Sequence, residues 1–163
     1  MKTMPDIKTI LYATDLGKFT RPVFRQAIAQ ANIHNAKLIM LHVVEPLNET
    51  ARAVISAWMP EKAIEEIQKD KMKDIIALMK ERVTKFSDEE CEGAGIEKLP
   101  LQDIVVVTGR PSEEILMASE KYHADLIVMG QSSKKVLGSK VMGSSARRVA
   151  RLSPVPVLIV PNM

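Results

Sequence analysis

Glycine and serine residues bound one basic loop near the end of the sequence, and their types suit a phosphate-binding site. Gly130 stands where the loop begins, and Gly143-Ser144-Ser145 stands where a helix is expected to begin after it. Free N–H groups and the positive end of the helix dipole favour an anion at a helix start. Serine hydroxyls add hydrogen-bond donors, and glycines allow the backbone to approach a phosphate closely. The loop therefore predicts a phosphate cradle.

The positive charge of the chain is confined to the same region. The 163 residues carry a formal net charge of +3, yet no acidic residue follows Asp125. Residues 126–163 contribute +6 and residues 1–125 contribute −3. The six cations are interleaved with apolar residues and form no groove-entering element, so we expect a small anion as their partner and no nucleic acid. These cations are Lys134, Lys135, Lys140, Arg147, Arg148 and Arg151.

The arginines of this segment have two interpretations. Arg147, Arg148 and Arg151 could steer a phosphate towards the cradle. Solvated arginines in the later turns of a helix more often only complement the helix dipole, and this second interpretation is the favoured one.

Apolar runs and helical patterns alternate along the chain that carries this loop. The helical patterns cover 21–34, 61 to about 87, 109 to about 122, and a segment from 143; the apolar runs cover 7–14, 37–44, 103–107, 125–130 and 155–160. The second run is almost continuously apolar, which is typical of a strand buried on both faces. Such alternation predicts one α/β domain over residues 1–163, a doubly wound, Rossmann-like parallel sheet of five strands in the order 3-2-1-4-5.

Three strand ends converge with the basic loop in this topology. A ligand of an open α/β sheet lies beyond the carboxyl ends of the strands, where the strand order reverses. The first strand ends in Ala13-Thr14-Asp15, the second in Val43-Val44, and the fourth in Met129-Gly130. We therefore expect the binding site at this edge.

At these residues the chain resembles the universal stress proteins, and the resemblance covers almost the whole sequence. Nucleotide-binding members carry Gly, two residues, Gly, nine residues, and then Gly-Ser or Gly-Thr after the fourth strand. Here Gly130 and Gly143-Ser144 have this spacing, with Ser133 in place of the second glycine. Further matching segments are Ile10 to Asp15, Leu41-His42-Val43, Gly109-Arg110-Pro111 and Pro156 to Val160.

The resemblance implies a stress-response regulatory protein of the adenine nucleotide alpha hydrolase-like fold. It would bind ATP, ADP or AMP, with Mg²⁺ or Mn²⁺ held by the phosphates, and form a homodimer through the last strand, Val155 to Val160. Asp15 would lie by the ribose, and the backbone of Val43 would pair with the adenine edge. The implied site as a whole consists of Ala13, Thr14, Asp15, Val43, Met129, Gly130, Ser133, Gly143, Ser144 and Ser145.

The same residues leave alternatives open. Ser133 could block part of the phosphate site, which would make the chain a nucleotide-free interaction module of the same fold. A third possibility is an enzyme, a ligase or a phosphatase. It is disfavoured because no general base and no nucleophile–histidine pair is evident, so we expect at most slow, incidental ATP hydrolysis. His42, in an apolar strand, is interpreted as a core histidine with its hydrogen bonds satisfied.

Further expectations concern two segments outside the site and the cellular location of the protein. The apolar spacing of 61–87 could mark a partner-binding surface, but packing on the sheet is sufficient to explain it. Residues Ala51 to Met59 form either a short helix over the adenine end or a surface connector. A single cysteine, Cys91, excludes an internal disulfide framework, and no signal peptide or membrane-spanning run is evident, so we expect a cytoplasmic protein without membrane contact.

Overall fold

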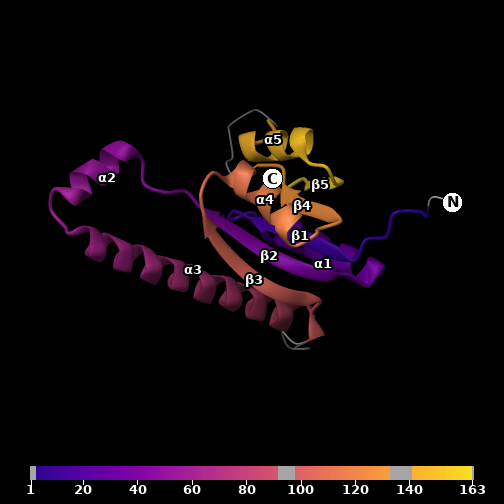
Figure 1. Cartoon of the computed structure of the whole chain (residues 1–163). Helices are drawn as coiled ribbons and strands as arrows, with labels where there is room; N and C mark the ends of the chain where they lie inside the picture. Colours follow the sequence, from indigo (N-terminus) through magenta and orange to yellow (C-terminus); the bar gives the residue numbers. More distant parts are fainter. Residues whose placement is uncertain (1–2, 92–97, 133–140, 163) are drawn as a thin grey trace.

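The site is built on a parallel sheet of five strands. The computed structural model describes residues 3–91, 98–132 and 141–162. Its strands are all parallel and lie in the order β3-β2-β1-β4-β5, as the sequence predicts (Figure 1). Their bounds are β1 Thr9–Thr14, β2 Lys37–Val44, β3 Leu101–Thr108, β4 Leu126–Gly130 and β5 Val157–Val160.

Helices cover both faces of this sheet, which explains why its central strands are apolar without interruption. Neighbouring residues of a strand point to opposite faces. Tyr12 therefore packs in one buried cluster with α1 and α3, whereas Leu11 packs in another with α4 and α5. The helices are α1 Arg21–His34, α2 Glu49–Ser56, α3 Glu61–Glu90, α4 Pro111–Lys121 and α5 Ser144–Leu152.

The last strand is shorter than the apolar run that predicts it. The sequence favours a strand over 155–160, but β5 begins at Val157. Pro156 has no N–H group to donate, although its carbonyl still accepts a hydrogen bond from Ile127 at 3.0 Å. The strand lies at the edge of the sheet and, within the part of the chain that the structure describes, pairs with β4 alone.

Helix α3 is longer than the part of the sheet that it covers. Its C-terminal half packs on the core through Met79, Val83 and Phe86. Its N-terminal half projects past the sheet (Figure 1), and Ile67 there is 52% exposed. The expectation that packing on the sheet explains the whole pattern of 61–87 is therefore wrong for the first turns.

Helix α2 lies at the far end of this projecting half of α3, away from the ends of the central strands (Figure 1). Asn48 caps the helix, because its side chain accepts a hydrogen bond from the Ala51 N–H at 2.7 Å. None of its residues is buried, and Trp58, just after it, is 85% exposed. The segment is thus a surface connector in helical form and not a cover over the site.

None of the helices within residues 3–91, 98–132 and 141–162 has the length and apolarity that a membrane crossing requires.

Candidate functional site

A pocket of about 250 Å³ opens at the carboxyl edge of the sheet, where β1 and β4 lie side by side. This is the point at which the strand order reverses, and its volume is near the lower end of the ~300–1,000 Å³ usual for small-molecule sites. Nine of the ten residues that the sequence predicts for the site line this pocket: Ala13, Thr14, Asp15, Val43, Met129, Gly130, Gly143, Ser144 and Ser145. The tenth, Ser133, lies outside the described residues.

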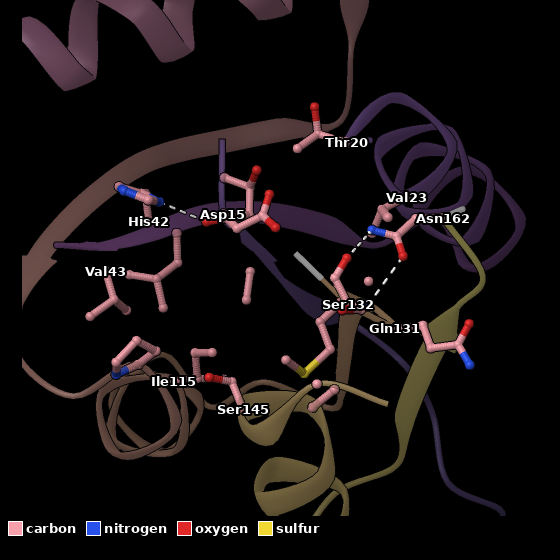
Figure 2. Close-up of a pocket in the computed structure, with 18 of the residues that line it drawn as sticks. Asp15, Thr20, Val23, His42, Val43, Ile115, Gln131, Ser132, Ser145 and Asn162 are labelled. Carbon is pink, nitrogen blue, oxygen red and sulfur yellow. Dashed lines mark hydrogen bonds between the residues drawn. The ribbon is translucent and has the colours of Figure 1, made fainter. Parts of the chain in front are cut away.

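The pocket has an apolar side and a polar side (Figure 2). Val43 from the end of β2 and Ile115 from α4 lie on one side, with Leu41 and Met129 also in the lining. Gln131 and Ser132, which follow β4, lie on the opposite side, and Asp15 lies between the two. An apolar slot beside convergent polar groups is the usual form of a small-molecule site.

The turn that carries Asp15 is held in a strained conformation. Asp15 Oδ1 accepts a hydrogen bond from the Gly17 N–H at 2.8 Å, and Thr14 Oγ1 accepts one from the Leu16 N–H at 3.2 Å. Arg82 of α3 donates to the Gly17 carbonyl at 3.3 Å. Leu16 has a φ of +59°, in the left-handed region that costs a leucine ~1–2 kcal/mol. These contacts fix the Asp15 carboxylate at the rim of the pocket.

His42 is hydrogen-bonded, as the sequence suggests, but it also forms part of the pocket wall. Its Nδ1 lies 2.7 Å from the Thr14 carbonyl oxygen (Figure 2). A carbonyl only accepts, so Nδ1 carries the proton, and the Nε2 of the neutral ring is then an acceptor. Within the described residues, no group of three or more His, Cys, Asp or Glu side chains could hold a metal ion.

Tyr12 forms part of the pocket lining and is 1% exposed. Burial raises the pKa of its phenol well above the usual value, because the charged form would lose its hydration. The phenol therefore stays neutral, and the negative charge on this strand end belongs to Asp15.

The two ends of the basic loop are joined at its base. Gln131 donates its N–H to Val160 of β5 at 2.9 Å, and its carbonyl accepts the Gly143 N–H at 2.8 Å. The Gly143 N–H is therefore already used within the protein. Ser144 and Ser145 open α5, and first-turn N–H groups have no acceptor within their own helix.

The arginines of α5 make local contacts and do not line the pocket. Arg147 donates to the Met142 carbonyl at 3.1 Å, and Arg148 lies 3.6 Å from Glu113 of α4. Neither contact involves the C-terminal end of α5, so they do not test the interpretation that these side chains complement the helix dipole. The three lysines of the basic segment lie outside the described residues.

The sequence does not identify several lining residues, chiefly Thr20, Val23, Gln131, Ser132 and Asn162. Gln131 and Ser132 directly follow a predicted strand end, so their place on a parallel sheet could have been inferred. Asn162 lies two residues beyond the last strand and meets the end of β4 only through the β4–β5 pairing. That position carries no local signal.

Comparison with known proteins agrees with this geometry. The sequence model of the universal stress protein family matches residues 6–161. A curated relative, the universal stress protein in the QAH/OAS sulfhydrylase 3' region of Thermus aquaticus, is 31% identical and matches over 94% of this chain and 98% of its own.

Solved structures share the fold over the whole chain. The MJ0577 protein of Methanocaldococcus jannaschii, a curated universal stress protein, is similar with a TM-score of 0.61, 25% identity, and coverage of 96% of this chain and 97% of its own. A universal stress protein in complex with cAMP is similar in fold, with a TM-score of 0.60, 22% identity, and coverage of 97% and 99%. A five-stranded sheet in this order, a pocket at its reversal point and a family match over nearly every residue lead to one assignment: the chain belongs to the universal stress protein family.

Proposed function

We propose that this protein is a stress-response regulator that binds ATP or a related adenine nucleotide in the pocket between β1 and β4. The observation that carries the proposal is that one pocket brings together an apolar side, a carboxylate, and a helix N-terminus with two serines. A nucleotide presents groups of matching chemistry, namely a base, ribose hydroxyls and phosphates.

Each part of the nucleotide has a partner of suitable chemistry. The base lies against Val43 and Ile115 and pairs with the backbone of Val43, while Asp15 accepts hydrogen bonds from the ribose hydroxyls. The phosphates lie towards Ser144 and Ser145, whose N–H groups and helix dipole favour an anion. Ala13, Thr14, Met129 and Gly130 complete the walls, and Ser133 is proposed to contact the phosphates from the loop.

One observation outside the pocket supports an adenine nucleotide. A structure of the same fold is a complex with cAMP, which has an adenine base, a ribose and a phosphate. Mg²⁺ or Mn²⁺ is proposed to bind mainly through the phosphates, as Mg²⁺ commonly does with nucleotides.

The proposal includes a regulatory and not an enzymatic role. Asp15 already accepts the Gly17 N–H, and His42 faces Thr14 on the side of the pocket away from Ser145 (Figure 2). Neither side chain is placed to activate a water at the phosphates, so any ATP hydrolysis is proposed to be slow and incidental. We further propose one domain over residues 1–163 and a cytoplasmic location.

Nucleotide titration tests the function directly. Calorimetry with Mg-ATP is expected to show heat of binding and a raised melting temperature, since a ligand of the native state stabilises it. Trp58 is 85% exposed and remote from the pocket, so its emission should stay unchanged and serves as a control. Absence of heat and of any melting shift at millimolar nucleotide would favour the alternative, a nucleotide-free interaction module.

A homodimer through the last strand is the second part of the proposal. The outer edge of β5 pairs with no strand among the described residues, and a second copy is proposed to continue the sheet there. Sedimentation equilibrium is expected to give twice the monomer mass. A monomer mass at every concentration tested would contradict this assembly without affecting the nucleotide site.

A further inference from the structure

Asn162 binds the first residues of the basic loop with both ends of its carboxamide. Its Nδ2 donates to the Ser132 carbonyl at 2.8 Å, and its Oδ1 accepts the Ser132 N–H at 3.2 Å (Figure 2). The side chain is well buried, since the residue is only 6% exposed. A carboxamide thus pairs with a backbone peptide as a strand residue would, and extends the β4–β5 pairing by one step beyond Gln131.

Gly130 and Asn162 compete for the same space. A Cβ atom on Gly130 would lie 2.7 Å from Asn162 Nδ2, with Val23 Cγ2 at 3.2 Å. Among the described glycines only Gly109 has a positive φ, so the backbone of Gly130 would accept an L-residue. The need for glycine at 130 therefore arises from the adjacent carboxamide and not from backbone conformation.

We propose that Asn162 is a positioning residue for the nucleotide site, and that Gly130 is glycine in order to admit its carboxamide. This inference rests on the proposed nucleotide function. By accepting the Ser132 N–H, Asn162 holds the peptide group between Gln131 and Ser132, and the carbonyl of that same peptide group accepts the Gly143 N–H at 2.8 Å. The N-terminus of α5 and the start of the loop are thereby kept at a fixed separation, which pre-organises the phosphate end of the pocket.

Substitution at either position is expected to release Ser132 and weaken nucleotide binding. Asn162→Ala should reduce Mg-ATP affinity about tenfold, equal to ~1.4 kcal/mol. Asn162→Asp keeps the shape but loses the donor to the Ser132 carbonyl, so it should weaken binding similarly. Gly130→Ala should do the same by displacing the carboxamide. In the double variant Asn162→Ala with Gly130→Ala the losses should not add, because the Cβ then occupies vacated space.

Two measurements separate this role from a general structural one. Affinity is measured by calorimetry on the full chain, and amide hydrogen exchange at Ser132 is measured without nucleotide. Exchange at Ser132 should speed up in all three single variants, while the melting temperature changes little. Asn32→Ala, at an exposed position on α1, is the matched control and should alter neither quantity.

The possible results distinguish the positioning role of Asn162 from the proposed nucleotide binding on which it rests. Unchanged Ser132 exchange in Asn162→Ala, or unchanged affinity in that variant when the unaltered protein binds Mg-ATP, would overturn the positioning role alone. Fully additive losses in the double variant would overturn the account of Gly130. No binding by the unaltered protein would overturn the proposed function and, with it, the role of Asn162 in nucleotide binding.

Discussion

Gly143→Val is expected to abolish nucleotide binding while the protein remains folded. Gly143 has φ −61° and ψ 156°, which a β-branched residue adopts readily. Its Cβ would lie 3.4 Å from the Gln131 carbonyl oxygen and 3.5 Å from Ser132 Cα, which is ordinary contact. The two methyl groups of valine would add bulk at this position in the pocket wall, where Ser144 and Ser145 also lie, and we expect them to hinder the approach of a phosphate. We expect an affinity loss of at least ~100-fold, or ~2.8 kcal/mol.

Gly143→Ala is the matched control for this substitution. Its single Cβ fits the observed space, so calorimetry with Mg-ATP should give an affinity close to that of the unaltered protein. Melting curves of both variants should lie near the original. If Gly143→Val bound Mg-ATP with unchanged affinity, the ligand would have to lie elsewhere than at the N-terminus of α5.

Strand ends and turn residues are the features of this site that the sequence predicts well. Asp15, Val43 and Met129 each end an apolar run, and parallel strands bring such ends to one edge. The family resemblance adds Gly130 and Gly143 through their spacing. In this region local pattern, topology and motif all indicate the same pocket, which is why nine of the ten predicted positions line it.

The place of Asn162 in the site could not be predicted from the sequence. Its partner, Ser132, is 30 residues away, and the contact exists only because β5 lies beside β4. In the sequence, a polar residue after the last strand cannot be distinguished from any other polar residue near the end of a chain. The motif glycine at 130 is visible in the sequence, whereas its physical cause, the carboxamide that fills the space of a Cβ, depends on the tertiary structure.

The N-terminal half of α3, which projects past the sheet, shows a second limit of prediction from the sequence. Helical spacing of apolar residues reports a face, but it does not report how much sheet lies beneath that face. Ile67 and Met79 occupy the same apparent pattern in α3, yet one is 52% exposed and the other 0%. Where the buried part of the helix begins depends on how far the sheet extends beneath it, and the strand that α3 contacts is β3.

Phe86→Ala is expected to destabilise the protein strongly, because Phe86 anchors the packed half of α3. Its ring is 4% exposed and meets Phe24 of α1 edge-to-face, with centroids 4.6 Å apart. The Arg21 guanidinium lies 5.9 Å from the same ring. Removal of a buried phenyl ring leaves a cavity and costs ~3–5 kcal/mol of unfolding free energy. Urea unfolding should show this as a lower midpoint with little change in slope.

Ile67→Ala on the projecting half of α3 provides the matched comparison on the same helix. Because Ile67 is 52% exposed, the loss of its side chain should change the unfolding free energy by no more than ~0.5 kcal/mol. A similar loss of unfolding free energy in both variants would mean that the N-terminal half of α3 packs on the rest of the protein in solution. A large difference would mean that the C-terminal half of α3 supplies most of the stabilising contacts of this helix.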